Sequence, residues 1–184
     1  MKPLPATLLA LAAMAWTGAA LARPPLEVVD SVDLERFQGR WYEIALLPNF
    51  FQRRCVAGTN ANYGLLPDGT IQVVNRCQRR DGQWLGVQGV ARLADADGPT
   101  RRLEVRFAPR WLAFLPFVWG DYNVIALGED YDYALVGSNN RRYLWILSRE
   151  PELADSTYQR LRAEAERQGF AVERLERTPQ PGDA

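Results

Sequence analysis

The chain has 184 residues, 47% of them hydrophobic and 24% charged, which is enough for one globular domain with a sizeable core. Its 22 basic and 22 acidic residues balance, which excludes a broad basic surface for binding nucleic acid. It has no histidine, which excludes Ser-His and Cys-His nucleophiles, and with two cysteines it does not suggest a zinc site. We therefore expect neither a metal nor a cofactor.

Residues 1–22 have the composition of a secretory signal peptide. Lys2 gives a basic start, residues 8–16 form an apolar stretch too short to span a bilayer, and residues 20–22 (Ala-Leu-Ala) form a cleavage signature. No cysteine precedes Cys55, so the cysteine of a lipid-modified bacterial signal is missing. We expect an exported, unanchored protein, either periplasmic or secreted, or peripheral to the outer membrane.

The mature chain begins with an extended arm over residues 23–33, followed by a helical turn over residues 34–38. Residues 40–47 are expected to form a strand. Seven further short strands are predicted between turn signals, over residues 59–66, 70–76, 83–93, 101–107, 121–127, 133–137 and 143–148. Hairpin-length connections favour an antiparallel meander, and eight strands can close into a barrel that holds one small ligand. A two-sheet sandwich is the alternative.

After Arg149 the pattern changes to that of a helix. Pro151 breaks the last strand, and Asp155 or Ser156 can cap a helix. An apolar stripe at helical spacing, which would pack against the outside of the sheet, is formed by Tyr158, Leu161 and Ala165. A short strand is expected over residues 170–175, so that the domain covers residues 34–177, and residues 178–184 are expected to form a flexible tail.

The two cysteines are expected to form a disulfide, because an exported protein folds in an oxidising compartment. A Cys55–Cys77 bridge would close a loop of about 22 residues and stabilise the fold by about 3 kcal/mol in the loop-entropy model. Two buried free thiols are the alternative.

Several motifs together resemble the lipocalins. They are residues 39–45 (Gly-Arg-Trp-Tyr-Glu-Ile-Ala), Asp130-Tyr131 in the sixth turn, and residues 144–149 (Leu-Trp-Ile-Leu-Ser-Arg) before the helix. The likeness covers most of the mature chain and is greatest to the bacterial lipocalin and apolipoprotein D branch. It implies an all-β fold, an eight-stranded up-and-down antiparallel β-barrel with a C-terminal α-helix packed outside.

The resemblance also implies how the barrel is closed at one end. Trp41 would plug this end, and Arg149 would reach across it as a cation–π partner. Gly39, Asp130 and Tyr131 belong to the same closure. A less favoured interpretation has Arg149 bind the acid group of a ligand.

A ligand would lie inside the barrel. Strand alternation places Tyr143, Trp145 and Leu147 on the inner face with Arg149. The likeness to apolipoprotein D places Tyr63, Asn75 and Asn123 toward the cavity, and an apolar wall would be completed by Leu103, Val105 and Phe107. Such a lining suits an acyl chain with a polar end, so we expect a fatty acid or lysophospholipid, carried in envelope lipid maintenance. Core packing is the alternative for each side chain.

In a meander, alternate loops share one end, here the open mouth implied by the resemblance. Basic residues gather there: Arg53, Arg54, Arg79, Arg80, Arg110, Arg141 and Arg142. The apolar loop 109–120 would contact a membrane or gate the barrel through Trp111, Phe114, Phe117 and Trp119, or would fold inward as a cap. The protein is expected to be a monomer or a homodimer.

Two other functions remain open. An enzyme on the same fold would need a free Cys55 as nucleophile and Glu43 or Asp121 as a base. Alternatively, a barrel filled with side chains would act as a protein-interaction module.

Overall fold

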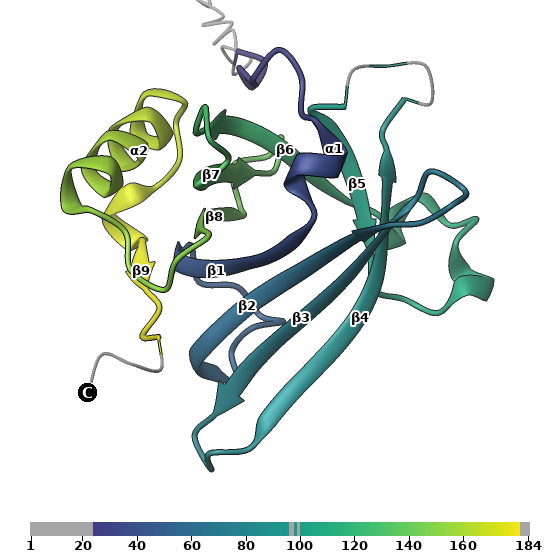
Figure 1. Ribbon diagram of the computed structural model, residues 1–184, viewed down its shortest axis with the longest axis horizontal. Coiled ribbons are helices and arrows are strands. Elements are labelled where there is room, and N and C mark those ends of the chain that lie inside the picture. The colour runs from purple at the N-terminus through teal and green to yellow at the C-terminus, as the bar shows by residue number, and fades with distance from the viewer. Residues whose placement is uncertain (1–23, 96–97, 99, 181–184) are drawn as a thin grey trace, which may run out of the picture.

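The computed structural model describes residues 24–95, 98 and 100–180, and the predicted signal peptide lies outside them. Within these residues the chain forms one sheet of nine strands in the order β2-β3-β4-β5-β6-β7-β8-β1-β9, and a further β2–β1 pairing closes it (Figure 1). Every neighbouring pair of strands is antiparallel. The predicted eight-stranded barrel is therefore confirmed, with one strand added, and the sandwich alternative is wrong.

The eight barrel strands are β1 (Gly39–Leu46), β2 (Cys55–Leu65), β3 (Ile71–Arg79), β4 (Trp84–Leu93), β5 (Arg102–Arg106), β6 (Gly120–Leu127), β7 (Tyr133–Gly137) and β8 (Leu144–Ser148). The main correction to the predicted bounds is at β2, which begins at Cys55 rather than at residue 59. Two register shifts and the positive φ of Gly58 break the alternation there, which hid the start of the strand.

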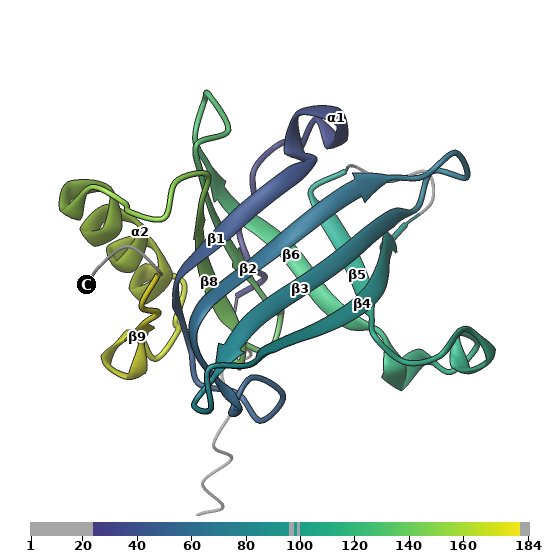
Figure 2. The ribbon, with the colours of Figure 1, turned by 60° about the horizontal axis from the view of Figure 1, so that its bottom comes forward.

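The barrel closes where residues 39–42 of β1 pair with residues 60–63 of β2. Figure 2 shows the strands crossing the barrel obliquely, with α2 (Asp155–Arg167) against the outer wall on one side. The short helix α1 (Leu34–Phe37) lies at one end, and Asp33 caps it by accepting from the backbone amides of Glu35 and Arg36. The predicted helical turn at residues 34–38 is thus present.

Two apolar clusters form on the two faces of the barrel wall. In β8, Leu144 and Ile146 face outward and pack with Tyr158, Leu161 and Ala165 of α2, so the predicted stripe docks the helix outside the barrel. The alternate β8 residues join the inner cluster, which includes Trp41, Tyr63, Val73, Val136 and Leu147.

The predicted caps are wrong: Ala154 is the N-cap residue, and Asp155 is already helical.

The C-terminal segment departs most from the prediction. Phe170 and Val172 belong to the cluster under α2, so the strand expected over residues 170–175 is replaced by the 3-10 turn η3 (Val172–Arg174). The strand β9 (Glu176–Arg177) follows and pairs with Ala45 and Leu46 of β1.

Residues 178–180 are not a loose tail, because they fill the wall where β1 and β2 separate. The amide of Gly58 donates to Pro179 O, and the amide of Thr178 donates to Ile44 O. The side chain of Gln180, 4% exposed, donates to Glu43 O and Thr59 O. The rest of the expected tail, residues 181–184, lies outside the described residues. In the described part of the chain, no helix has the length and apolar character needed to cross a bilayer.

Candidate functional site

The closed end of the barrel is held by Arg149 and Trp41. The guanidinium carbon of Arg149 lies 4.0 Å from the centroid of the Trp41 indole, which is fully buried. The same guanidinium donates to four backbone carbonyls, those of Arg36, Gln38, Arg40 and Tyr131. Because its donors are engaged by the protein, this geometry gives no support to Arg149 as a ligand's partner.

The backbone around this pair is specialised for the close approach. Gly39 has φ +90°, and a Cβ there would lie 3.4 Å from Arg149 Nη1. Tyr131 has φ 60°, its hydroxyl accepts from the Asp33 amide, and the Arg36 guanidinium carbon lies 4.1 Å from its ring centroid. Asp130 lies exposed in the same turn. This end of the barrel therefore has a structural role.

Side chains nearly fill the deep half of the barrel next to the closed end. The hydroxyls of Tyr63 and Tyr122 lie 2.9 Å apart. A small cavity of about 20 Å³ is lined by Leu34, Phe37, Tyr63, Ile71, Val73, Ala91, Leu103, Val105 and Tyr122. That volume holds about one water molecule, so an acyl chain cannot extend to the floor without side-chain movement.

The two phenols stay neutral at any ordinary pH. Burial raises the pKa of Tyr63 to about 12, and it raises the pKa of Tyr122 well above the ordinary value. One hydroxyl of the pair donates to the other, which leaves the second hydroxyl proton for another acceptor.

The inner wall of the mouth half is apolar and reachable by solvent. Leu85 and Val87 align with the inward Cys77 and Asn75 of β3, and Phe107 follows β5 in the same alternation as Leu103. Although these side chains face the interior, Leu85 is 37% exposed, Val87 is 46% exposed and Phe107 is 39% exposed. The barrel is thus open at this end and lined with exposed apolar groups.

An aromatic group forms another part of this inner wall. Tyr143 lies directly before β8 and Trp145 lies in it, on the same face, and their rings stack with centroids 6.1 Å apart. Phe51 of the β1–β2 loop lies 5.4 Å from Tyr143. Leu147 lies deeper on the same face and is buried in the inner cluster. The structure therefore brings together Tyr143, Trp145 and Leu147 and adds Phe51.

Asn75 and Asn123, which were both predicted to face the cavity, lie on opposite faces of the wall. Asn75 aligns with the buried Ala61 of β2, and its Oδ1 is buried without a hydrogen-bond partner among the described residues. Asn123 alternates with the inward Tyr122 and Val124, so it points outward. Its amide donates to Gly137 O and Asn139 Oδ1. The prediction that Asn123 faces the cavity is wrong, whereas Asn75 keeps an unused acceptor inside.

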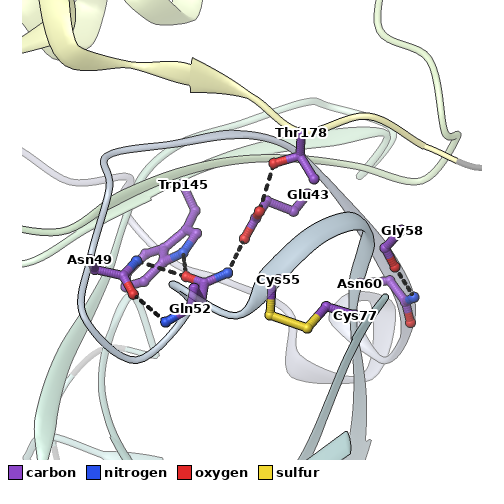
Figure 3. Close-up of a disulfide and its surroundings, with 9 residues drawn as sticks. All are labelled: Glu43, Asn49, Gln52, Cys55, Gly58, Asn60, Cys77, Trp145 and Thr178. Carbon is purple, nitrogen blue, oxygen red and sulfur yellow. Dashed lines mark hydrogen bonds between the residues drawn. A yellow bond between two sulfur atoms is a disulfide. The ribbon is translucent and has the colours of Figure 1, made fainter. Parts of the chain in front are cut away.

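A buried polar network at the mouth was missed by sequence reasoning (Figure 3). Glu43 is 4% exposed, and its carboxylate accepts from Gln52 Nε2 at 2.6 Å and from Thr178 Oγ1 at 2.7 Å. Gln52 Oε1 in turn accepts from Trp145 Nε1. Burial raises the pKa of Glu43 more than these two donors lower it. The sequence did contain one indication that Glu43 is buried, since it lies two residues after Trp41 and strand alternation therefore places it on the same inner face.

The disulfide between Cys55 and Cys77 is confirmed and lies beside this network (Figure 3). It joins β2 to β3 with Cα atoms 5.4 Å apart.

The enzyme alternative needed a free Cys55, so that version of it is wrong. Its candidate base Asp121 accepts from the Asn139 amide, and Glu43 is held by Gln52 and Thr178. Within the described residues, no group of three or more carboxylates or cysteines could hold a metal.

Most of the predicted basic residues at the mouth are exposed there. Exposed positions are Arg53, Arg54, Arg80 and Arg142, whereas Arg110 is exposed but acts electrostatically on Asp68 in the β2–β3 turn, away from the mouth. Arg79 forms an ion pair with Asp81 at 3.2 Å. Arg141 is used structurally, since its guanidinium donates to the carbonyls of Pro24, Asn139 and Gln168.

The apolar loop between β5 and β6 stands away from the barrel interior. It contains the 3-10 turns η1 (Arg110–Leu112) and η2 (Pro116–Val118), and Trp111, Phe114 and Phe117 are 73%, 78% and 80% exposed. Trp119 packs 3.9 Å from the guanidinium carbon of Arg92, whose side chain leaves the outer face of β4. The alternative in which this loop folds inward as a cap is therefore wrong.

Comparison with known proteins places the whole domain in one family. Residues 32–180 match the family described as a lipocalin-like domain. Temperature-induced lipocalin-1 of Arabidopsis thaliana is 41% identical over 84% of this chain and 83% of its own length. Outer membrane lipoprotein Blc of Escherichia coli K12 is 40% identical over 99% of both chains. Mouse apolipoprotein D is 31% identical over 85% of this chain and 80% of its own.

The solved structures agree on the fold. Insecticyanin from the tobacco hornworm Manduca sexta superposes with a TM-score of 0.66 at 20% identity, covering 85% of each chain. At this identity the likeness concerns the barrel and not the ligand.

Proposed function

The chain belongs to the lipocalin family, and on that premise we propose that it binds and carries a fatty acid or lysophospholipid in the mouth half of its barrel. The observation that carries the proposal is the exposed apolar inner wall made by Leu85, Val87 and Phe107 opposite the aromatic group. Apolar side chains that face inward yet meet solvent are the lining that an acyl chain would cover.

The expected driving force is burial of the chain. About ten methylenes at ~0.8 kcal/mol each would leave useful affinity after the entropic cost of binding. The acyl chain would point toward the Tyr63–Tyr122 pair, and its anionic or zwitterionic end would lie among the exposed arginines of the rim. The binding residues proposed are Tyr63, Asn75, Phe107, Tyr143, Trp145 and Leu147.

A fluorescence titration tests this proposal. A lysophospholipid with a medium-length acyl chain, kept below its critical micelle concentration, should bind in the low micromolar range and change the tryptophan emission, to which Trp145 of the inner wall contributes. Val87→Lys places a charge on the inner wall and should weaken binding roughly 10-fold or more, which corresponds to the penalty of burying or displacing that charge. Asn62→Lys, on the exposed outer face of β2, is the matched control and should bind as the wild type does. Equal affinity of both variants would refute binding inside the barrel.

We further propose that the loop carrying Trp111, Phe114 and Phe117 touches the membrane surface from which lipid is collected. Three aromatic side chains more than 70% exposed, beside the exposed Arg110, suit an anionic bilayer interface. In liposome flotation with phosphatidylglycerol-containing vesicles, Trp111→Ser combined with Phe114→Ser should abolish co-flotation. Unchanged flotation of the double variant would exclude this contact.

We propose that the protein is exported without a lipid anchor. The support is the leader-like composition of residues 1–22 and the lack of a cysteine at its end. This differs from the lipoprotein named in the Escherichia coli relative. Intact-mass measurement of the exported protein should give the unmodified chain beginning at Arg23, whereas an added acyl mass would contradict the proposal.

The nearly filled deep half favours one competing function, a barrel that recognises a partner protein and carries no ligand. The lysophospholipid titration separates the two, because the competing function predicts no saturable binding. A catalytic role is not part of our proposal, since neither Cys55 nor Glu43 is free to act.

A further inference from the structure

The loop between β5 and β6 has no apolar core of its own. Neither η1 nor η2 contains a buried residue, and the three exposed aromatic side chains of the loop meet solvent. Backbone hydrogen bonds that each span three residues fold the loop locally, beginning with the Leu112 amide to Pro109 O and ending with the Trp119 amide to Pro116 O. Figure 2 shows the loop projecting from the barrel between β5 and β6. The loop therefore needs contacts with the barrel to keep one orientation.

Trp119, at the end of the loop, supplies such a contact. Its indole lies against two arginines of the outer wall, with the guanidinium carbon of Arg92 3.9 Å and that of Arg106 5.2 Å from the ring centroid. Its Nε1 donates to Ala113 O at 2.8 Å, so the same side chain also holds the middle of the loop. Within the described part of the chain, Trp119 is the one aromatic residue of this loop with a ring or cation–π contact.

Both arginines are fixed by the barrel. Arg92 of β4 donates through Nε and Nη2 to Glu104 Oε2, at 3.1 Å and 2.9 Å. Arg106 of β5 is 8% exposed, its Nε is buried without a hydrogen-bond partner, and its Nη1 donates to Ala108 O at the start of the loop. A buried guanidinium without a carboxylate is costly, and an aromatic face can stabilise it. The two ends of the loop are thus attached to the same cluster on the outer wall.

We propose that Trp119 positions this loop for membrane contact without touching the bilayer itself. The inference rests on the proposed membrane contact and names the residue that orients it. With Trp119 docked on Arg92 and Arg106, the aromatic side chains already point outward before a bilayer is met, so little conformational entropy is lost on binding. Attraction between the exposed Arg110 and Asp68 is screened by solvent and does not replace this stack.

Partitioning onto phosphatidylglycerol-containing vesicles tests this role. Trp119→Leu should lower the partition constant roughly 10-fold or more, while the lysophospholipid affinity and the urea midpoint stay near those of the wild type. Trp119→Phe keeps an aromatic face over the two arginines and should remain within about 3-fold of the wild type. Trp84→Leu, at an exposed tryptophan of β4, is the matched control and should partition as the wild type does.

A charge-neutral pair of substitutions tests the other side of the stack. Arg92→Met with Glu104→Gln removes the cation beside Trp119 together with its carboxylate partner, so the net charge of the protein is unchanged. This variant should also partition more weakly than the wild type, and trypsin should cleave it faster after Arg110, because the loop is no longer held. It decides the question if circular dichroism shows that Trp119→Leu does not fold.

The outcomes separate this inference from the membrane contact on which it rests. A wild type that does not bind the vesicles would remove both. If the wild type binds and Trp119→Leu, or the charge-neutral pair, binds equally well, the membrane contact stands and the positioning role is overturned. A loss in Trp119→Phe as large as that in Trp119→Leu would overturn it too, because the aromatic face would then not be what holds the loop.

Discussion

Arg149 is the residue on which the closed end depends, since one side chain satisfies four carbonyls and covers Trp41. Arg149→Met should lower the free energy of unfolding by about 2–4 kcal/mol, because it leaves the partly buried carbonyls of Gln38 and Tyr131 without this donor and removes the cation–π contact. Arg149→Lys should recover only part of the loss, since an ammonium cannot reproduce the planar fork. Urea denaturation measures both, and Arg80→Met, at an exposed arginine, should change stability by less than about 0.5 kcal/mol.

Glu43 should make stability depend on pH. Burial raises its folded pKa above the ordinary 4.5, so the folded state favours the protonated carboxyl more than the unfolded state does. Its contribution is therefore fully present below pH 4.5 and is lost as the pH rises through the folded pKa. Glu43→Gln cannot titrate, so the stability of the wild type relative to this variant should fall as the pH rises above 4.5. Urea midpoints measured from pH 4 to pH 8 would contradict this if that difference were constant.

At the residue scale, the sequence predicted inward faces where alternation is regular. Tyr143, Trp145 and Leu147 of one unbroken stretch were assigned correctly to the inner side. The assignment of Asn123 to the cavity was wrong because it came from likeness to a relative. Its neighbours Tyr122 and Val124 face inward, so alternation places Asn123 on the outer face. Gln52 could not have been found, since its place in the mouth depends on the path of an irregular loop.

At the scale of elements, the C-terminal segment is part of the barrel wall. Gln180→Ala removes two hydrogen bonds and leaves Glu43 O and Thr59 O without this donor. We expect a loss of about 1–3 kcal/mol in the free energy of unfolding. Gln159→Ala, at an exposed position of α2, is the control and should lie within about 0.5 kcal/mol of the wild type. Equal stability of the two variants in urea would show that the segment does not support the barrel.

Elements with a strong period could be predicted, and elements defined by tertiary contacts could not. The stripe of Tyr158, Leu161 and Ala165 gave both α2 and the face it buries. Residues 176–180 have no pattern of their own, because their conformation is set by the gap between β1 and β2 that they fill. The loop 109–119 was recognised as apolar, but its outward position depends on the contact between Trp119 and Arg92.

For the whole molecule, the two ends of the barrel have separate tasks. The closed end holds the family motifs and is packed around Trp41, with room for about one water molecule nearby. The mouth end contains the disulfide, the Glu43 network and the exposed apolar wall. Motifs of the closed end therefore predict the fold, whereas ligand choice depends on loops and inner side chains at the mouth that have no comparable signature.

Native mass spectrometry of the gently purified protein tests the central claim, lipid binding inside the barrel, most directly. We predict a second charge-state series heavier by one fatty acid or lysophospholipid per chain, which incubation with lysophospholipid restores after delipidation. Val87→Lys should lose this series, and Asn62→Lys should keep it. A wild-type chain that carries no lipid and takes up none on incubation would contradict the account.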